Sequence, residues 1–91
     1  MPAKVTVRVF HELRTTLGQG ELELDANTLG DVVASLISRN NSIKELIFDS
    51  KGDIRAYTMF YVNNAAQNPP DFSRKLKDGD LVLLVPTAAG G

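Results

Sequence analysis

Apolar and polar residues alternate along two early segments of the chain, residues 4–10 and 21–25. A period of two places successive side chains on opposite faces of an extended strand. The first segment has Val5, Val7 and Val9 at alternate positions, and β-branched residues favour strands. Glycines precede the second segment and indicate a turn. The pattern therefore predicts two strands joined as a hairpin.

The clearest helical signal lies between residues 28 and 40. Its apolar residues have the spacing i, i+3, i+4, i+7 and i+8 of one buried helical stripe: Leu29, Val32, Val33, Leu36 and Ile37. Thr28 is a suitable N-cap because its hydroxyl can accept from a free first-turn N–H, and Asp31 suits the positive end of the helix dipole. Asn40 and Asn41 mark the stop. We therefore predict a long amphipathic helix from Leu29.

A short helix and two further strands are predicted downstream. Ser42 and Glu45 have the spacing of a capping box, and the residues after Ser42 give a helix over residues 43–47 one apolar side. Residues 57–62 combine aromatic and β-branched residues, and residues 81–85 are all apolar. Both segments are therefore predicted to be strands, with a further short strand as an option around Ala65.

Proline and glycine delimit the remaining segments. Residues 68–71 contain two prolines, which lack the N–H that a central strand needs, so we expect a loop there. Lys77 to Asp80 is the sequence of a tight turn, and Pro86 closes the last strand. The element order indicates an α+β fold, a mixed sheet with one long helix packed across one face. Residues 1–86 form this domain, and residues 87–91 are expected to be a flexible C-terminal tail.

Composition excludes several classes of function. The 91 residues, 43% hydrophobic and 23% charged, suit one folded domain. Ten basic and eleven acidic residues nearly cancel and are spread over both halves of the chain, so we expect no nucleic-acid partner. The longest apolar run, Leu81 to Val85, is far shorter than a membrane span. With no secretory signal visible, we expect a cytoplasmic protein that binds no membrane.

The side chains offer little catalytic chemistry. There is no cysteine, which excludes disulfides, thiolate metal sites and a cysteine nucleophile. His11 is the sole histidine, and at a strand end it is interpreted as a surface residue rather than a catalyst. The aspartates lie in turn sequences, where they favour local hydrogen bonds. We see no nucleophile, metal cluster or phosphate loop, so we expect neither a bound metal or cofactor nor an enzyme that acts alone.

Several short motifs in order resemble a known family. They are Phe10-His11-Glu12-Leu13-Arg14 after the first strand, Thr28-Leu29-Gly30-Asp31 at the helix start, Tyr61-Val62-Asn63, Lys77-Asp78-Gly79-Asp80, and the ending Val85-Pro86-Thr87-Ala88-Ala89-Gly90-Gly91. Together they resemble the MoaD/ThiS family over essentially the whole chain. The resemblance implies the β-grasp, ubiquitin-like fold and the function of a sulfur carrier.

The family resemblance also implies where the chemistry takes place. An E1-like partner enzyme would use ATP to adenylate the carboxylate of Gly91, which would then receive sulfur and become a thiocarboxylate. Gly90 would give the tail access to a narrow channel, because a side chain there would block close approach. With no cysteine in the chain, a backbone terminus would have to hold the sulfur. The alternative is that the two glycines are a frayed terminus without function.

A second set of residues is predicted to bind partners. If the valines of the first strand face the helix, alternation turns five apolar residues to the other side of the sheet: Phe10, Met59, Tyr61, Leu83 and Val85. The family docks its activating enzyme and its acceptor on this face beside the tail, where Pro86 also lies, and Arg14 matches a basic position in the family's first loop. The alternatives are a second small core under the loops and, for Arg14, a solvated side chain.

Three functions remain open. The first is a sulfur carrier for molybdopterin synthesis, bound to the large subunit of molybdopterin synthase, since Phe10 to Arg14 looks most like that branch. Other sulfur acceptors, in cysteine or thiolated-tRNA synthesis, are alternatives. The second is a covalent protein modifier, because the chain length is similar to that of the archaeal ubiquitin-like modifiers. The third is a plain binding module of ubiquitin-like shape whose tail does nothing.

Overall fold

The computed structural model describes residues 2–55, 58–67 and 70–86. Five strands form one sheet in the order β2-β1-β5-β3-β4. Their bounds are Ala3–Val9 (β1), Glu21–Ala26 (β2), Thr58–Val62 (β3), Ala65–Gln67 (β4) and Leu81–Pro86 (β5). β1 and β5 are parallel, and the other neighbours are antiparallel. This mixed sheet confirms the predicted α+β fold.

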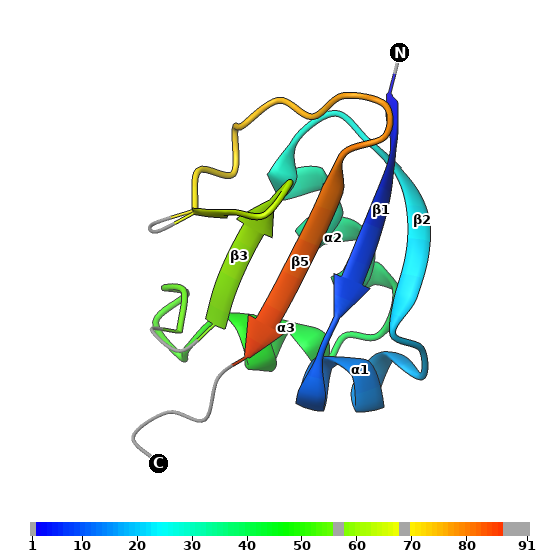
Figure 1. The fold of residues 1–91 in the computed structure, drawn as a ribbon. Coiled ribbons are helices and arrows are strands. Elements are labelled where there is room, and N and C mark those ends of the chain that lie inside the picture. Colours follow the sequence, from blue (N-terminus) through cyan, green and yellow to red (C-terminus); the bar gives the residue numbers. More distant parts are fainter. Residues whose placement is uncertain (1, 56–57, 68–69, 87–91) are drawn as a thin grey trace.

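Three helices accompany the sheet, α1 (His11–Leu17), α2 (Leu29–Arg39) and α3 (Ile43–Ile47). α2 and α3 lie behind the sheet in Figure 1, and α1 lies at the end where β1 and β5 finish. The opposite face of the sheet is turned toward the viewer. No helix in the described ranges is long and apolar enough to cross a membrane.

The core lies between the sheet and α2. Val5, Val7 and Val9 of β1 are at most 2% exposed, and Phe60 of β3 and Leu84 of β5 are fully buried. α2 contributes the predicted stripe, of which four residues are buried: Leu29, Val32, Val33 and Leu36. The inward-facing residues of the strands and the buried stripe of α2 therefore pack together in one apolar layer, as the sequence predicts.

The start of α2 is fixed by its own cap and by a distant loop. The Thr28 hydroxyl accepts from the Asp31 N–H, and the Asp31 carboxylate accepts from the Thr28 N–H, both at 3.2 Å. The Gly30 N–H donates to the Phe72 carbonyl at 2.8 Å. A Cβ at Gly30 would lie 3.0 Å from that oxygen, so only glycine permits this approach without displacement. The predicted cap at Thr28 is confirmed, and Asp31 completes it.

α1 is a helix where the sequence pattern indicates a strand end and a loop. Phe10, its N-cap residue, makes no side-chain cap bond, and His11 begins the helix with φ of +54°. Leu13 is fully buried, and Leu17 packs against the core one turn later. Gly18 ends the helix in the left-handed conformation, with φ of +85°. Two apolar residues in seven are too weak a period to reveal a helix without a cap signal.

The predicted capping box at Ser42 and Glu45 is wrong, although the predicted helix over residues 43–47 is confirmed. Ser42 has helical backbone angles, and its side chain forms no cap bond. Asn40 has that role instead. Its side-chain oxygen accepts from the Ser42 N–H at 2.9 Å, and its backbone carbonyl accepts from the Ile43 N–H at 3.0 Å.

The remaining boundaries agree closely with the sequence. The strand predicted over residues 57–62 is β3, with Tyr57 outside the described residues, and β4 confirms the optional strand around Ala65. β5 extends through Pro86, which is the cross-strand partner of Thr58. Residues 68–69 of the predicted loop and residues 87–91, the predicted tail, lie outside the described residues.

Candidate functional site

The sheet carries an apolar surface on the side away from α2. We use the term apolar face for its six half-buried residues, which are Phe10, Met59, Tyr61, Leu81, Leu83 and Val85. Met59 is the cross-strand partner of Val85, and Tyr61 is that of Leu83. The intervening residues Phe60, Val62, Val82 and Leu84 are buried. The predicted alternation is therefore confirmed on β3 and β5.

Leu81 is the member of the apolar face that the sequence analysis does not include. It lies two residues before Leu83 and faces the same side, so the alternation already contained the signal. None of the six residues belongs to the buried core cluster, and Figure 1 shows no helix of the described part of the chain in front of β1, β5 and β3. The alternative of a second core therefore finds no support among the described residues.

Three residues of the apolar face, Phe10, Met59 and Val85, lie near the end of β5. The Phe10 N–H donates to the Leu84 carbonyl at 3.2 Å, just beyond the pairing of β1 with β5. Val85 directly precedes Pro86, the last residue of β5, and its cross-strand partner Met59 lies on the neighbouring strand β3. Pro86 is buried. Gly90 and Gly91, the predicted reactive residues, follow this point and lie outside the described residues.

The other half of the same sheet face is charged. On β1 and β2 the exposed side chains are Lys4, Arg8, Glu21, Glu23 and Asp25. Arg8 and Glu21 are cross-strand partners and form an ion pair with Nε and Oε1 2.6 Å apart. Because both side chains are more than half exposed, solvent screens this pair strongly. The face thus changes from apolar on β3 and β5 to charged on β1 and β2.

The turn before β5 is fixed by a nearly buried carboxylate. Asp80 is 8% exposed and accepts from the Asn63 side-chain amide at 2.9 Å and from the Lys77 N–H at 2.8 Å. The Asn63 side-chain oxygen accepts from the Leu81 N–H at 2.9 Å. Asn63 therefore joins the end of β3 to the start of β5. Gly79 gives the turn its left-handed residue, with φ of +87°.

This network perturbs the acidity of Asp80. The hydrogen bond from the Asn63 amide is the largest cause that lowers the pKa of Asp80, and burial opposes it. The Lys77 N–H and the positive charges of Lys77 and Arg74 lower the pKa of the carboxyl further. The carboxylate is thus bound in its ionised form, and its contribution here is structural. It holds the register of β5, which carries half of the apolar face.

Arg14 and His11 both lie on α1, not on a strand or in a loop as predicted. A Cβ at Gly20 would lie 3.1 Å from Arg14 Nε, so the Arg14 side chain lies over the turn between α1 and β2. Both residues are exposed. Arg14 is therefore not among the strand residues of the apolar face, and its predicted partner contact remains a prediction.

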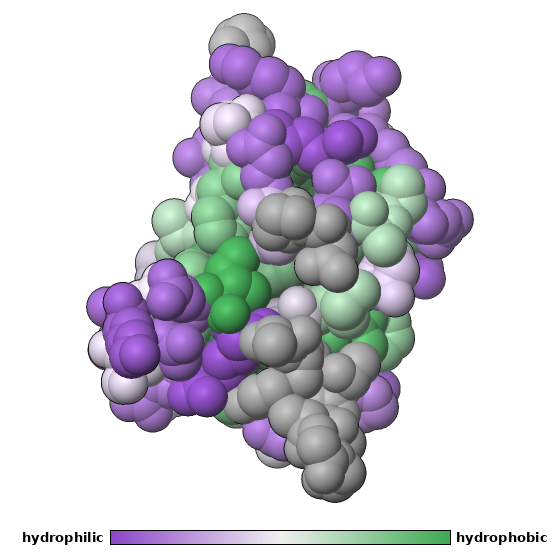
Figure 2. Space-filling model, turned by 90° about the vertical axis from the view of Figure 1, so that its left-hand side faces the viewer, coloured by the Kyte–Doolittle hydropathy of each residue, from purple (hydrophilic) through white to green (hydrophobic). Residues whose placement is uncertain are grey.

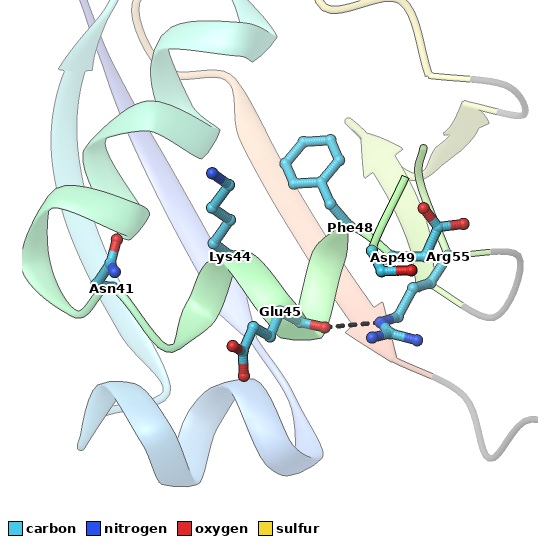
Figure 3. Close-up of a pocket in the computed structure, with 7 residues that line it drawn as sticks. Asn41, Lys44, Glu45, Phe48, Asp49 and Arg55 are labelled. Atoms are coloured by element: carbon cyan, nitrogen blue, oxygen red, sulfur yellow. Dashed lines mark hydrogen bonds between the residues drawn. The ribbon is translucent and has the colours of Figure 1, made fainter. Parts of the chain in front are cut away.

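The helix side of the molecule carries an open pocket with charged side chains. An open pocket of about 490 Å³ lies between α3 and the loop that follows it. In Figure 3, Lys44, Glu45, Asp49 and Arg55 bring charges of both signs to it, and Arg55 Nε donates to the Glu45 carbonyl at 2.6 Å. Among the described residues no three His, Asp or Glu side chains form a group that could hold a metal ion.

Figure 2 turns the β3 edge of the molecule toward the viewer. Apolar side chains occupy the middle of this view, with hydrophilic side chains above them and at the lower left. The edge of the molecule at β3 therefore presents apolar side chains between hydrophilic regions.

Comparisons with known proteins agree with this architecture. The model of the ThiS family matches residues 7–91. The sulfur carrier protein CysO of Mycobacterium tuberculosis is 32% identical over 91 residues, covering 96% of this chain and 98% of the relative. The small archaeal modifier protein 1 of Methanosarcina acetivorans is 28% identical, with a TM-score of 0.83 over 100% of this chain and 99% of that one.

A chain in the crystal structure of the BexX/CysO complex of Amycolatopsis orientalis is also similar. It is 27% identical with a TM-score of 0.79, over 96% of this chain and 99% of that chain. These neighbours have the β-grasp, ubiquitin-like fold that the sequence resemblance implies, so the predicted fold class is confirmed.

Proposed function

The chain belongs to the ThiS family, and from that premise we propose that it is a sulfur carrier that reacts at the carboxylate of Gly91. That carboxylate attacks the α-phosphorus of ATP on an E1-like enzyme and releases pyrophosphate. The terminal sulfur of a partner's persulfide then attacks the carbonyl carbon and displaces AMP. A second thiol cleaves the resulting acyl disulfide and leaves the thiocarboxylate. Both thiols come from partners, because this chain has no cysteine.

The observation that carries the proposal is the extent of the family match. It covers residues 7–91 and so includes Gly90 and Gly91. The apolar face supports it from the folded domain. Five residues after Pro86 reach at most about 17 Å from the end of β5, so an enzyme that holds the terminus must also contact the adjoining surface. Phe10, Met59 and Val85 are the apolar residues at that end.

The partners follow from this arrangement. The E1-like enzyme docks on the apolar face and draws the tail into its nucleotide site, and a sulfur acceptor later uses the same face. Half-buried apolar side chains still expose apolar area, and a docked partner gains stability by removing that area from water. Pro86 is the last residue of β5, and Arg14 on α1 is proposed as a further contact of the partner.

Two observations favour different acceptors. The Phe10 to Arg14 stretch resembles the molybdopterin branch and supports the large subunit of molybdopterin synthase as acceptor. The 32% identical relative is named CysO, which supports a cysteine-forming acceptor equally. The likeness to a small archaeal modifier protein supports a second function, transfer of the activated Gly91 to a lysine amine of another protein.

Mass spectrometry tests the carrier proposal. The chain is incubated with an E1-like enzyme from the same organism, ATP and a sulfide source. We expect a gain of about 16 mass units, the replacement of one oxygen by sulfur. A variant without Gly91 should gain nothing, and Gly90→Ala should react more slowly because its methyl group narrows the approach. The proposal is wrong if the intact chain keeps its mass, or if the chain without Gly91 reacts equally well.

A further inference from the structure

Met59 is the one methionine in the described part of the chain, and it belongs to the apolar face. The chain has no cysteine and no tryptophan, and its other methionine is Met1, which lies outside the described residues. The other five members of the apolar face are aromatic or aliphatic and carry no sulfur. The Met59 thioether is therefore the only group on this face that a mild oxidant such as a peroxide attacks.

The fold leaves the Met59 side chain accessible. Its neighbours Thr58 and Phe60 are buried on the opposite side of the sheet, whereas Met59 is half-buried. It belongs neither to the buried core cluster nor to the partly buried residues that pack against that cluster. In Figure 1 no helix of the described part of the chain lies in front of β3. Oxidation of Met59 therefore does not require the fold to open.

Met59 also lies close to the point where the tail starts. It is the cross-strand partner of Val85, and Thr58 beside it pairs with Pro86, the last residue of β5. Cross-strand partners have their Cβ atoms about 5 Å apart. A protein that covers Val85 therefore also covers the Met59 side chain, and the polarity of that side chain affects how well the protein docks.

Oxidation makes this side chain polar. The sulfur lone pair attacks one oxygen of hydrogen peroxide, so an S–O bond forms as the O–O bond breaks, and the second oxygen leaves as water with the proton of the first. The sulfoxide carries an acceptor that would be buried without a donor against an apolar surface. We propose that Met59 is a site of reversible oxidation and that its sulfoxide weakens docking of the partner on the apolar face. The inference rests on the proposed function for the identity of that partner.

Such a site links docking to the redox state of the sulfur donor. The persulfide that supplies sulfur in the proposed reaction belongs to a cysteine, and peroxides also oxidise cysteine sulfur. When Met59 is oxidised under the same conditions, the chain docks less well on its activating enzyme. Gly91 is then adenylated less often while the donor cannot deliver sulfur. Because the chain has no cysteine, this response depends on a methionine.

Peroxide treatment of two matched chains tests the inference. Wild type and Met59→Leu, which keeps a similar apolar volume without sulfur, are treated with hydrogen peroxide and then freed of it. Met1 is present in both and controls for oxidation at that residue. Peptide mapping by mass gives the rate of oxidation at residue 59 in the folded chain and in urea. Calorimetric titration against the E1-like enzyme, without ATP, gives Kd before and after treatment, and urea unfolding gives the stability.

Met59 in the folded chain should be oxidised within about 10-fold of its rate in urea. Treatment should raise the Kd of the wild type about 10-fold and move its urea midpoint by less than about 0.5 M. Treated Met59→Leu should keep the Kd of its own untreated sample. A methionine sulfoxide reductase should restore the Kd of the oxidised wild type.

Four results overturn the inference: slower oxidation of the folded chain than this limit, an unchanged Kd of the oxidised wild type, an equal loss in treated Met59→Leu, or no measurable binding of the untreated wild type. Oxidation and sulfur loading each add about 16 mass units, so they are separated by position. The oxygen maps to residue 59 without ATP, and the sulfur maps to the C-terminal peptide. A chain whose docking responds to peroxide but that never gains sulfur refutes the carrier function and leaves the oxidation site in place.

Discussion

Replacing Asp80 by asparagine should destabilise the fold more than its small change in size suggests. The carboxylate accepts two hydrogen bonds, from the Asn63 amide and the Lys77 N–H. An asparagine at position 80 has one acceptor oxygen, so one donor would face an NH₂ group. Asn63 cannot rotate its amide to adapt, because its oxygen accepts from the Leu81 N–H. Asp80 itself is only 8% exposed, so the donor that faces the NH₂ group would lose its partner beside a nearly buried side chain.

The cost can be worked from these contacts. A hydrogen bond to a charged group contributes about 1.5–3 kcal/mol, and an unpaired buried donor costs about 1–3 kcal/mol. We expect Asp80→Asn to lower the free energy of unfolding by about 2–4 kcal/mol at pH 7. With a urea m-value of about 1–1.5 kcal/mol/M for a chain of this size, the midpoint of urea unfolding should fall by about 1.3–4 M.

The pH dependence gives an independent check. The folded-state pKa of Asp80 is below its usual value, so the carboxylate's stabilisation is complete above the unfolded-state pKa of about 3.9 and is lost as pH falls through the folded-state pKa. The difference between wild type and Asp80→Asn should be constant from pH 5 to 8 and shrink below about pH 4. A midpoint within 0.3 M of wild type at pH 7, or a difference that stays constant down to pH 3, would refute the reasoning.

Three further substitutions test the fold and the apolar face. Gly30→Ala should cost about 1–3 kcal/mol in urea unfolding, because its Cβ would meet the Phe72 carbonyl at 3.0 Å; wild-type stability would show that the loop yields without cost. Leu83→Ala and Leu84→Ala remove the same atoms from opposite faces of β5. The fully buried Leu84 should cost about 2–5 kcal/mol, whereas Leu83→Ala should cost under about 1 kcal/mol and weaken E1-like enzyme binding. Equal effects on stability would contradict the assignment of faces.

The sequence predicts most of the fold because its periods are strong and local. Val5, Val7 and Val9 alternate in a way that allows one interpretation, and the stripe that starts at Leu29 fits only a helix. The parts that it does not predict depend on distant contacts. α1 is short and has no side-chain cap at its start, so packing against other elements, which buries Leu13, stabilises it. The contact of Gly30 with Phe72 joins segments that no local pattern connects.

The candidate site also has one part that local patterns predict and one part that depends on distant contacts. The sequence alone places Met59, Tyr61 and Leu83 on the side away from the core. This placement needs only the strand period and the side on which the helix packs. The charged half of the sheet face can be seen in the sequence as the acidic residues of β2. The residues that these lie beside depend on the strand register. Thr6 lies between Glu23 and Leu81 because β1 pairs with β2 on one side and β5 on the other, and that order is a property of the fold.

The position of β5 between β1 and β3 also constrains how this protein is made. The strand that is synthesised last occupies the middle of the sheet and buries Val82 and Leu84. During translation, the edges of β1 and β3 that later pair with β5 remain unpaired. Such edges are prone to association with other chains. Native pairing can be completed only after β5 has left the ribosome. A chain interrupted before β5 would lack its central strand, so we expect it to stay unfolded and to be open to proteolysis.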